Sequence, residues 1–483
     1  MSNIEPVNKK TAVKNSIWKL LESFLSKGIS MIVTIVIARL LLPEAYGVIA
    51  LTNVYIHLSD ILIQAGFSTA LIRKKNVTND DYSTVLGLSL LSAIFLYSLI
   101  FVLSPTIANI YETPVLSPVL RVVSISLFSQ AFGAVRTSVI TREMKFKVLF
   151  ICTVISNIIS GLIGITIAIT NATVWALVAQ QLSQQFILTI ALYIAIKIHI
   201  SLKISRQSIK ELLKPSMKIL TSSFLSFAGD SLFSLAIGKV YSLEQLGYYE
   251  KGGQLPRQFS LYTFSAVSSV FLPIFASYQD DNNKLNDVFS RVISVSCYVI
   301  FPLMAFLSMT ATPVITLLLT EKWLPAVPIL RWSCLYYLAT PILLAHVQLH
   351  FAIGKNETRI KAEIFRIVLM LIAFAILFYF NASIIVITAA LSIIQFIVVL
   401  FITYETKKAT GYKVISSIKD LVPTLISTIL MCIAVFFISR LNIGVLVLLI
   451  IETLVGMIVY FSSSLFLKNK ALSEFLHIIR ISK

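Results

Sequence analysis

KNSIWKLLESFLSKGIS, at Lys14–Ser30, is followed 200 residues later by a similar stretch, KPSMKILTSSFLSFAGD, at Lys214–Asp230. Seven of the seventeen aligned positions are identical. The register then continues without a shift, so that Gly47 aligns with Gly247. A chance likeness between two helices rich in Leu and Ser is the alternative explanation. Because the register is kept beyond the first helix, we predict an internal duplication of a membrane helix bundle.

The composition indicates an all-α, polytopic membrane protein. Of the 483 residues, 57% are hydrophobic and 13% are charged, with a mean hydropathy of +0.89, whereas soluble domains carry about 25% charged residues. Apolar runs of about 20 residues, long enough to cross a bilayer as helices, recur along the chain. The net charge of +18 would suggest nucleic acid in a soluble protein. Basic cytoplasmic loops explain it here, so we expect no nucleic-acid partner.

Hydropathy predicts about fourteen transmembrane helices. Their predicted ranges are 15–39, 45–66, 82–108, 115–136, 147–169, 173–197, 213–239, 245–275, 288–318, 326–352, 361–380, 382–404, 418–439 and 442–467. Most Lys and Arg residues fall beside the segments that share a side with the N-terminus. The positive-inside rule therefore predicts that both termini are cytoplasmic.

Each predicted repeat contains six spans, an even number, so both repeats enter the membrane from the same side. This arrangement predicts two parallel-repeat six-helix lobes around a central cavity, with an appended helix pair. The predicted boundaries are 1–205 for the N-terminal lobe, 206–405 for the C-terminal lobe, and 406–483 for the last two helices and a cytoplasmic tail. The basic connection near 197–214 is expected either to lie on the inner surface or to be an ordinary loop.

The second predicted span carries a polar stripe. Asn53, His57, Asp60 and Gln64 are spaced by 4, 3 and 4 residues, which places them on one helix face. Such a stripe can line water, bind a cation or carry a proton. Hydrogen bonding between helices is the alternative, and for Asn53 and Gln64 it is the better interpretation.

Charged residues also interrupt the first and seventh spans. Lys27 shares a face with Ser23, Ser30 and Thr34, although a lysine this close to the helix end can also extend to the interface. Asp230 lies in the second repeat at the position of Ser30, so the polar stripe is duplicated but its charge is not.

The eighth predicted span combines charges with helix-weakening residues. Glu250, Gln254 and Arg257 share a face, and Lys251 follows Glu250 directly. Gly252, Gly253 and Pro256 are expected to break the helix, which would direct free amides and a guanidinium at one anion. An Arg257–Glu250 pair that only stabilises the helix is the alternative.

Arg121 and Arg331 lie in equivalent spans of the two repeats, the fourth and the tenth. Their offset is 210 rather than 200 residues. They are candidates for lining the cavity, with an ordinary place near the outer interface as the alternative.

The sequence lacks the motifs of an enzyme or ATPase. It contains no GxxxxGK[ST] loop, no HExxH and no Gly-x-Ser-x-Gly. The four cysteines lie in apolar segments and form no CxxC pair. The predicted outer loops are too short to carry an active site, so we expect a protein that is not an enzyme, with no cofactor and no metal.

Four segments resemble one transporter family. They are ARLLLPEAYGVIALTNV (38–54), QAGFSTALIRKK (64–75), LGYYEKGGQLPRQF (246–259) and SSVFLPIFASYQDD (268–281). These segments resemble the Wzx-type flippases of the polysaccharide transport family, in particular the branch that is similar to colanic-acid exporters. That family belongs to the multidrug/oligosaccharidyl-lipid/polysaccharide (MOP) exporter superfamily.

The resemblance implies a flippase that moves undecaprenyl-pyrophosphate-linked oligosaccharide from the cytoplasmic to the periplasmic leaflet of the bacterial inner membrane by alternating access. Related lipid II flippases bind the pyrophosphate with cations on their first helices and on the eighth, which suggests Lys27, Arg257 and Lys251 here. The lipid bilayer and other polysaccharide-assembly proteins are the expected partners. The alternative is a cation-coupled drug or metabolite antiporter of the same superfamily, in which Asp60 and Asp230 would bind the cation.

Overall fold

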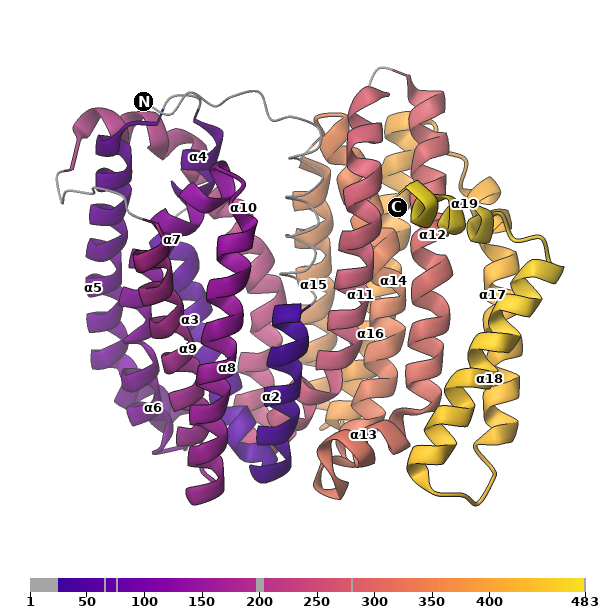
Figure 1. Ribbon diagram of the computed structural model, residues 1–483, viewed down its shortest axis with the longest axis horizontal. Coiled ribbons are helices and arrows are strands. Elements are labelled where there is room, and N and C mark those ends of the chain that lie inside the picture. Colours follow the sequence, from indigo (N-terminus) through magenta and orange to yellow (C-terminus); the bar gives the residue numbers. More distant parts are fainter. Residues whose placement is uncertain are drawn as a thin grey trace. The chain divides into compact units, whose positions relative to one another are not determined.

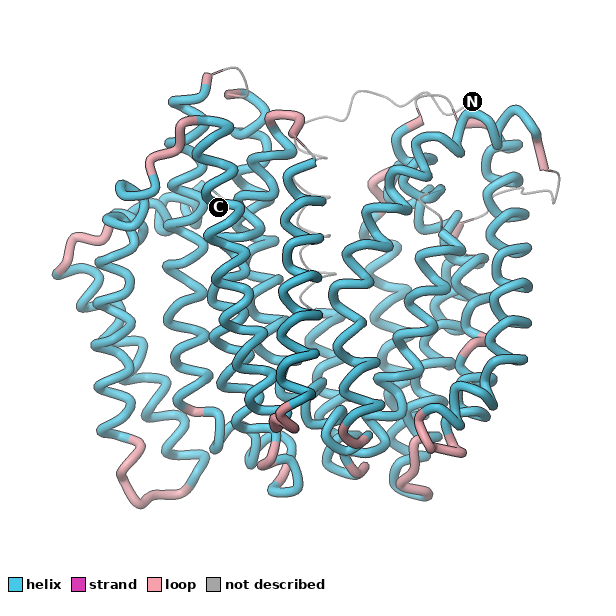
Figure 2. The backbone as a smooth tube through the Cα atoms, turned by 180° about the vertical axis from the view of Figure 1, so that it is seen from behind, coloured by secondary structure: helices cyan, strands magenta, loops and turns pink. Residues whose placement is uncertain are grey.

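The computed structural model describes residues 25–64, 67–74, 77–196, 204–278, 281–355 and 357–481. In these ranges the chain forms helices and contains no strand, as Figures 1 and 2 show. The all-α prediction is therefore confirmed. The chain divides into two compact units, Met1–Gly247 and Tyr248–Lys483.

The first unit holds the helices up to α10 and the first turn of α11. Its helices are α2 (Lys27–Leu40), α3 (Pro43–Gln64), α4 (Phe67–Arg73), α5 (Asn79–Ile110), α6 (Leu116–Val123), α7 (Ser126–Arg142), α8 (Phe146–Thr170), α9 (Trp175–Ala195) and α10 (Arg206–Val240). The other helices are α11 (Leu243–Ser277), α12 (Asn282–Met309), α13 (Ala311–Leu319), the 3-10 turn η2 (Glu321–Trp323), α14 (Ala326–Ala352), α15 (Glu357–Tyr379), α16 (Ile384–Thr410), α17 (Val414–Ile438), α18 (Val445–Phe466) and α19 (Lys470–Ile481).

Eleven helical segments among the described residues are long and apolar enough to cross a membrane, and one of them, Leu116–Arg142, comprises both α6 and α7. Each coincides with a predicted span, and α2, α10 and α11 coincide with the remaining three, so the polytopic membrane fold is confirmed. Residues 15–24 of the first predicted span lie outside the described ranges. Two predicted spans are each divided into two helices: 115–136 into α6 and α7, and 288–318 into α12 and α13.

The duplication is visible in the helix boundaries. Helix α2 ends at Leu40 and α10 at Val240, while α3 begins at Pro43 and α11 at Leu243. All four ends keep the offset of 200 residues that the sequence predicts.

The two repeats also make a reciprocal contact at the start of α3 and α11. A Cβ atom on Gly47 would lie 1.9 Å from the carbonyl oxygen of Leu243, and one on Gly247 would lie 2.0 Å from that of Pro43. Each glycine therefore lets the backbone of the other repeat approach where no side chain fits.

Helix α10 packs within the first unit, against α3 and α4. Its Leu212 shares a hydrophobic core with Phe67 and Leu71 of α4 and Val135 of α7. The sequence boundary at 205/206 follows the duplication, whereas the compact unit ends after α10. The division into two lobes and an appended helix pair therefore remains a prediction.

An ion-pair network ties the start of α10 to the connection before α5. The Nζ atom of Lys74 lies 2.8 Å from Oδ2 of Asp81 and 2.7 Å from Oε2 of Glu211. Partial burial opposes the charge on Lys74, but the two carboxylates outweigh it and raise the pKa of Lys74. The hydrogen bond from Lys74 lowers the pKa of Glu211.

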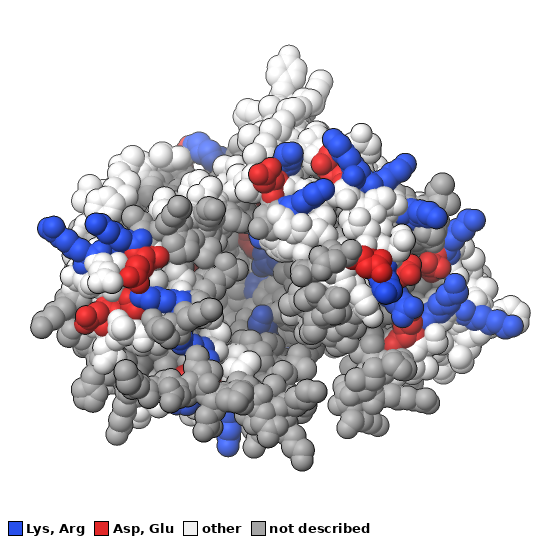
Figure 3. Space-filling view, turned by 90° about the horizontal axis from the view of Figure 1, so that it is seen from above, with Lys and Arg blue, Asp and Glu red and all other residues white. Residues whose placement is uncertain are grey.

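In the second unit, α12 packs against α14 and α17, and α14 packs against α16. Phe289 and Val292 of α12 lie in a buried core with Ala345 and Leu349 of α14. The appended pair of α17 and α18 joins α12 through a smaller cluster that includes Tyr298. On the face seen from above in Figure 3, many Lys and Arg side chains gather.

Three of the prolines that lie inside helices have a common arrangement. Each frees a carbonyl group four residues earlier, because proline has no N–H to donate. In each case a side chain from another helix donates a hydrogen bond to the freed carbonyl. The prolines are Pro105, Pro302 and Pro341, and the acceptor–donor pairs are Phe101 with Arg121 (3.3 Å), Tyr298 with Tyr460 (2.6 Å) and Tyr337 with Ser260 (2.9 Å). These bonds satisfy polar backbone groups that lipid cannot satisfy.

Candidate functional site

The predicted stripe on the second span lies on α3. Both carboxylate oxygens of Asp60 accept from Nε2 of Gln64 at 2.9 Å, and both side chains are half-buried. His57, one turn earlier, is exposed. The expectation that Gln64 bonds between helices is wrong for this contact, because its partner Asp60 lies on the same helix. Asp60 thus has an amide partner that stabilises its charge.

Asn53 makes the contact between helices that the packing interpretation predicts. Its Oδ1 atom accepts from Nε2 of Gln181 on α9 at 2.9 Å. Nearby on α9, Gln184 donates to Oδ1 of Asn157 on α8 at 2.7 Å, and Asn157 donates to the carbonyl of Ser26 at 2.9 Å. We call Asn53, Asn157, Gln181 and Gln184 the amide cluster.

The glutamines of the amide cluster are half-buried rather than enclosed. Only 17% of the apolar window of α9 is buried in the structure. A partly exposed amide is costly against hydrocarbon, so polar groups at membrane depth normally face other polar groups or a water-filled space. Among the described residues of the first unit, the amide cluster is therefore the strongest candidate for a polar surface that faces a water-filled space.

Sequence reasoning missed Asn157, Gln181 and Gln184. The signal was present in the stretch AQQLSQQ (179–185), which places four glutamines within one apolar span. These residues are uncharged, and a search directed at intramembrane charges passes over them.

The other candidates in the first unit have different surroundings. Lys27 is the first residue of α2 and its side chain is exposed. Arg121 bonds to Ser104 at 2.8 Å and to Phe101, and its guanidinium lies 4.3 Å from the Phe101 ring centroid. These contacts give Arg121 a packing role between α6 and α5. The side chain of Asp230 lies outside the described part of the structure.

The candidates of the second unit lie on α11, which is one continuous helix from Leu243 to Ser277. The expectation that Gly252, Gly253 and Pro256 break the helix is wrong. Gly252 instead allows close packing on α14, since a Cβ atom there would lie 2.9 Å from Cγ2 of Ile329. Because α11 is not broken, it offers no free backbone amides to an anion, and only side chains can bind one here.

Two cations on α11 differ in exposure. Lys251 is buried, and its Nζ donates to Oε1 of Gln254 at 3.0 Å, whereas Arg257 is exposed. Glu250 is half-buried beside them. Gln254 lies three residues from both Lys251 and Arg257, but the two cations are six residues apart, which places them about 120° apart around the helix and about 9 Å apart along it.

Arg331 lies on α14 and is exposed, with Nη2 3.5 Å from Oγ1 of Thr312 on α13. Arg331 and Arg257 belong to the second unit, while Lys27 and the α3 stripe belong to the first. The predicted convergence of these residues around one cavity remains a prediction. Among the residues that the structure describes, no group of three or more His, Cys, Asp or Glu side chains is placed to hold a metal ion.

A family described as "Polysaccharide biosynthesis protein" matches residues 36–328. The chain belongs to this family. Its relatives include the "Lipopolysaccharide biosynthesis protein WzxC" of Escherichia coli (strain K12), with 21% identity over 76% of this chain and 75% of that protein. An "Uncharacterized membrane protein in cps region" of Klebsiella pneumoniae is 22% identical over 73% of this chain and 75% of that protein.

Solved structures show the same fold. The "Lipid II flippase MurJ, inward closed conformation" matches with a TM-score of 0.75 at 18% identity, over 93% of this chain and 98% of that one. A multidrug resistance MATE family transporter of the MOP superfamily, in its inward-facing conformation, matches with a TM-score of 0.59 at 14% identity, over 82% and 94%. The expected resemblance to Wzx-type flippases of the MOP superfamily is confirmed. This polysaccharide biosynthesis protein is a multi-pass membrane transport protein.

Proposed function

We propose that this chain flips undecaprenyl-pyrophosphate-linked oligosaccharide units from the cytoplasmic to the periplasmic leaflet of the bacterial inner membrane. The transported units would supply lipopolysaccharide, capsule or exopolysaccharide assembly. The family match and the fold support a transport role. The observation that carries the substrate class is the amide cluster, in which Asn53, Gln181 and Gln184 are half-buried. Uncharged amides that both donate and accept hydrogen bonds suit sugar hydroxyls.

The pyrophosphate requires cations that can replace its hydration. Arg257 and Lys27 are exposed on their helices, and a guanidinium can bind two phosphate oxygens at once. Lys251 is buried and bonded to Gln254, so its role is to add positive potential near Arg257 rather than to contact the phosphate.

The transport cycle would be alternating access between the two repeats, with the lipid tail remaining in the bilayer. The sequence has no nucleotide-binding loop, so an ion gradient or the membrane potential would drive the cycle. Asp60, with both oxygens held by Gln64, and Glu250 are the candidates for ion coupling. The same carboxylates would be the cation site of an antiporter, which is the alternative function.

The test is a flipping assay in proteoliposomes with undecaprenyl-pyrophosphate oligosaccharide. We expect Arg257→Ala to slow flipping about tenfold or more, because a charged hydrogen bond contributes about 1.5–3 kcal/mol. Lys27→Ala should also slow it. The matched control is Lys239→Ala, which removes an exposed lysine that pairs with Glu112 at 3.1 Å.

A second comparison distinguishes binding of the glycan from binding of the pyrophosphate. Gln184→Leu should slow flipping of a long oligosaccharide more than flipping of undecaprenyl pyrophosphate without sugars. Equal slowing of both substrates would remove the amide cluster from sugar binding. Unimpaired flipping in both cation variants would remove the proposed pyrophosphate site.

A further inference from the structure

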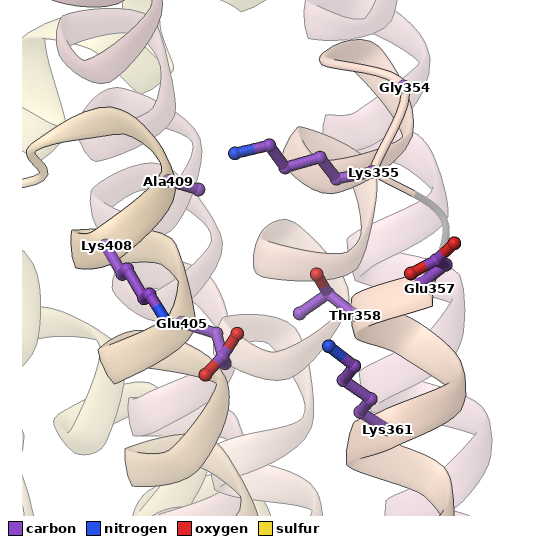
Figure 4. Close-up of a pocket in the computed structure, with 8 residues that line it drawn as sticks. All are labelled: Gly354, Lys355, Glu357, Thr358, Lys361, Glu405, Lys408 and Ala409. Atoms are coloured by element: carbon purple, nitrogen blue, oxygen red, sulfur yellow. The ribbon is translucent and has the colours of Figure 1, made fainter.

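A pocket of about 440 Å³ lies at the end of the second unit where α14 turns into α15 and α16 ends (Figure 4). Its lining includes Lys355, Thr358, Lys361, Glu405 and Lys408. None of these residues belongs to the proposed transport site.

Positive charge predominates in this pocket. Three lysines line it together with two glutamates, Glu405 and Glu357, so the lining carries an excess of one positive charge. Figure 4 shows Lys355 and Lys361 reaching into the space between the helices from the α15 side. Across the described ranges, no ion pair joins Lys355, Lys361 or Lys408 to a carboxylate.

Apolar surface continues from the pocket along both helices. On α15, Ile364 is one turn from Lys361 and is 48% exposed. On α16, Tyr404 is one turn from Lys408 and is 64% exposed. Phe365 of α15 stacks on Phe401 of α16, with ring centroids 4.7 Å apart.

We propose that this pocket binds the head group of an anionic glycerophospholipid from the surrounding bilayer. Lys361 and Lys408 would hold the phosphate, and the acyl chains would lie on the exposed apolar faces of α15 and α16. A basic pocket between membrane helices beside lipid-exposed surface suits a ligand that carries phosphate and hydrocarbon together. Glu405 would accept a hydrogen bond from a hydroxyl, which favours a glycerol head group such as that of phosphatidylglycerol.

The test is native mass spectrometry of the purified full-length protein during titration with phosphatidylglycerol. We expect Lys361→Gln/Lys408→Gln to bind it about 30-fold more weakly, from about 1 kcal/mol for each lysine. The matched control is Lys407→Gln/Lys419→Gln, which removes two exposed lysines that do not line the pocket. Lys361→Arg/Lys408→Arg keeps the charge and should retain binding.

Four results would overturn the proposal. The first is equal loss in the control pair, which would indicate a diffuse charge effect. The second is displacement of the lipid by inorganic phosphate or glycerol 3-phosphate at equal concentration, which would indicate a site for soluble anions. The third is equally tight binding of phosphatidylethanolamine, and the fourth is tighter binding of undecaprenyl pyrophosphate than of phosphatidylglycerol. Selective loss in the pocket pair, with binding retained by the arginine pair, would support it.

Discussion

Replacing Gly47 with Ala tests the contact between the two repeats. The new methyl group would lie 1.9 Å from the carbonyl oxygen of Leu243, whereas a carbon atom normally approaches such an oxygen to about 3.3 Å. The backbones would have to separate by about 1.4 Å, and no rotamer change can relieve the clash because both groups belong to main chains. Overpacking typically costs about 1–3 kcal/mol, and we expect the upper end here.

Thermal unfolding in detergent measures this effect, with a thiol-reactive dye as the reporter. Cys152, Cys297 and Cys334 are buried free thiols that unfolding exposes. We expect Gly47→Ala to lower the Tm by about 3 °C, at about 1 °C per kcal/mol for a chain of 483 residues. The matched control is Gly133→Ala, because its Cβ would lie at an ordinary 3.5 Å from Oγ1 of Thr189.

The control should be neutral or stabilising by up to about 1 kcal/mol, since alanine favours a helix more than glycine does. A Gly247→Ala substitution in the Gly47→Ala background should cost less than it does alone, because both residues relieve the same crossing. Equal Tm values for Gly47→Ala and Gly133→Ala would refute the close crossing of the repeats.

Two further substitutions test other contacts. Tyr460→Phe leaves the Tyr298 carbonyl without its donor and should lower the free energy of unfolding by about 1–3 kcal/mol. In a Pro302→Ala background the restored backbone N–H should remove most of that loss. Thermal unfolding of wild type, the two single variants and the double variant measures this cycle. Lys74→Gln breaks the ion pairs with Asp81 and Glu211. The variant should therefore have a lower free energy of unfolding than wild type at pH values between the titration of the two carboxylates and that of Lys74. The carboxylate contribution is lost as pH falls through the lowered pKa values of Glu211 and Asp81, and the Lys74 contribution is lost as pH rises through its raised pKa. A difference in stability that stays constant down to pH values well below the ordinary carboxylate range of about 4 would contradict this assignment.

Hydropathy located the membrane helices because a long apolar segment that crosses lipid has few alternatives to a helix. The repeat predicted that helix ends would recur 200 residues apart, as the first residues of α3 (Pro43) and α11 (Leu243) do. Helix interruptions were less predictable. Gly252 and Pro256 suggested a break in α11, but packing on Ile329 uses the glycine and the helix continues.

The candidate site was predicted only in part. The spacing of Asp60 and Gln64 placed them on one face, and they bond to each other within α3. The role of Arg121 depends on a carbonyl freed by Pro105, a partner that no spacing on its own helix reveals. Which side chains meet between helices depends on how each helix is rotated about its own axis. The periodicity of a single sequence does not determine that rotation relative to the neighbouring helices.

The most direct test of the central claim uses wild-type protein in proteoliposomes with two substrates in parallel. One is undecaprenyl-pyrophosphate oligosaccharide, followed by the exposure of its sugars on the opposite leaflet, and the other is a cationic dye under a proton or sodium gradient. We expect the protein to accelerate transfer of the lipid-linked oligosaccharide and to leave the dye untransported. Gradient-driven efflux of the dye without any lipid transfer would contradict the flippase proposal and identify an antiporter.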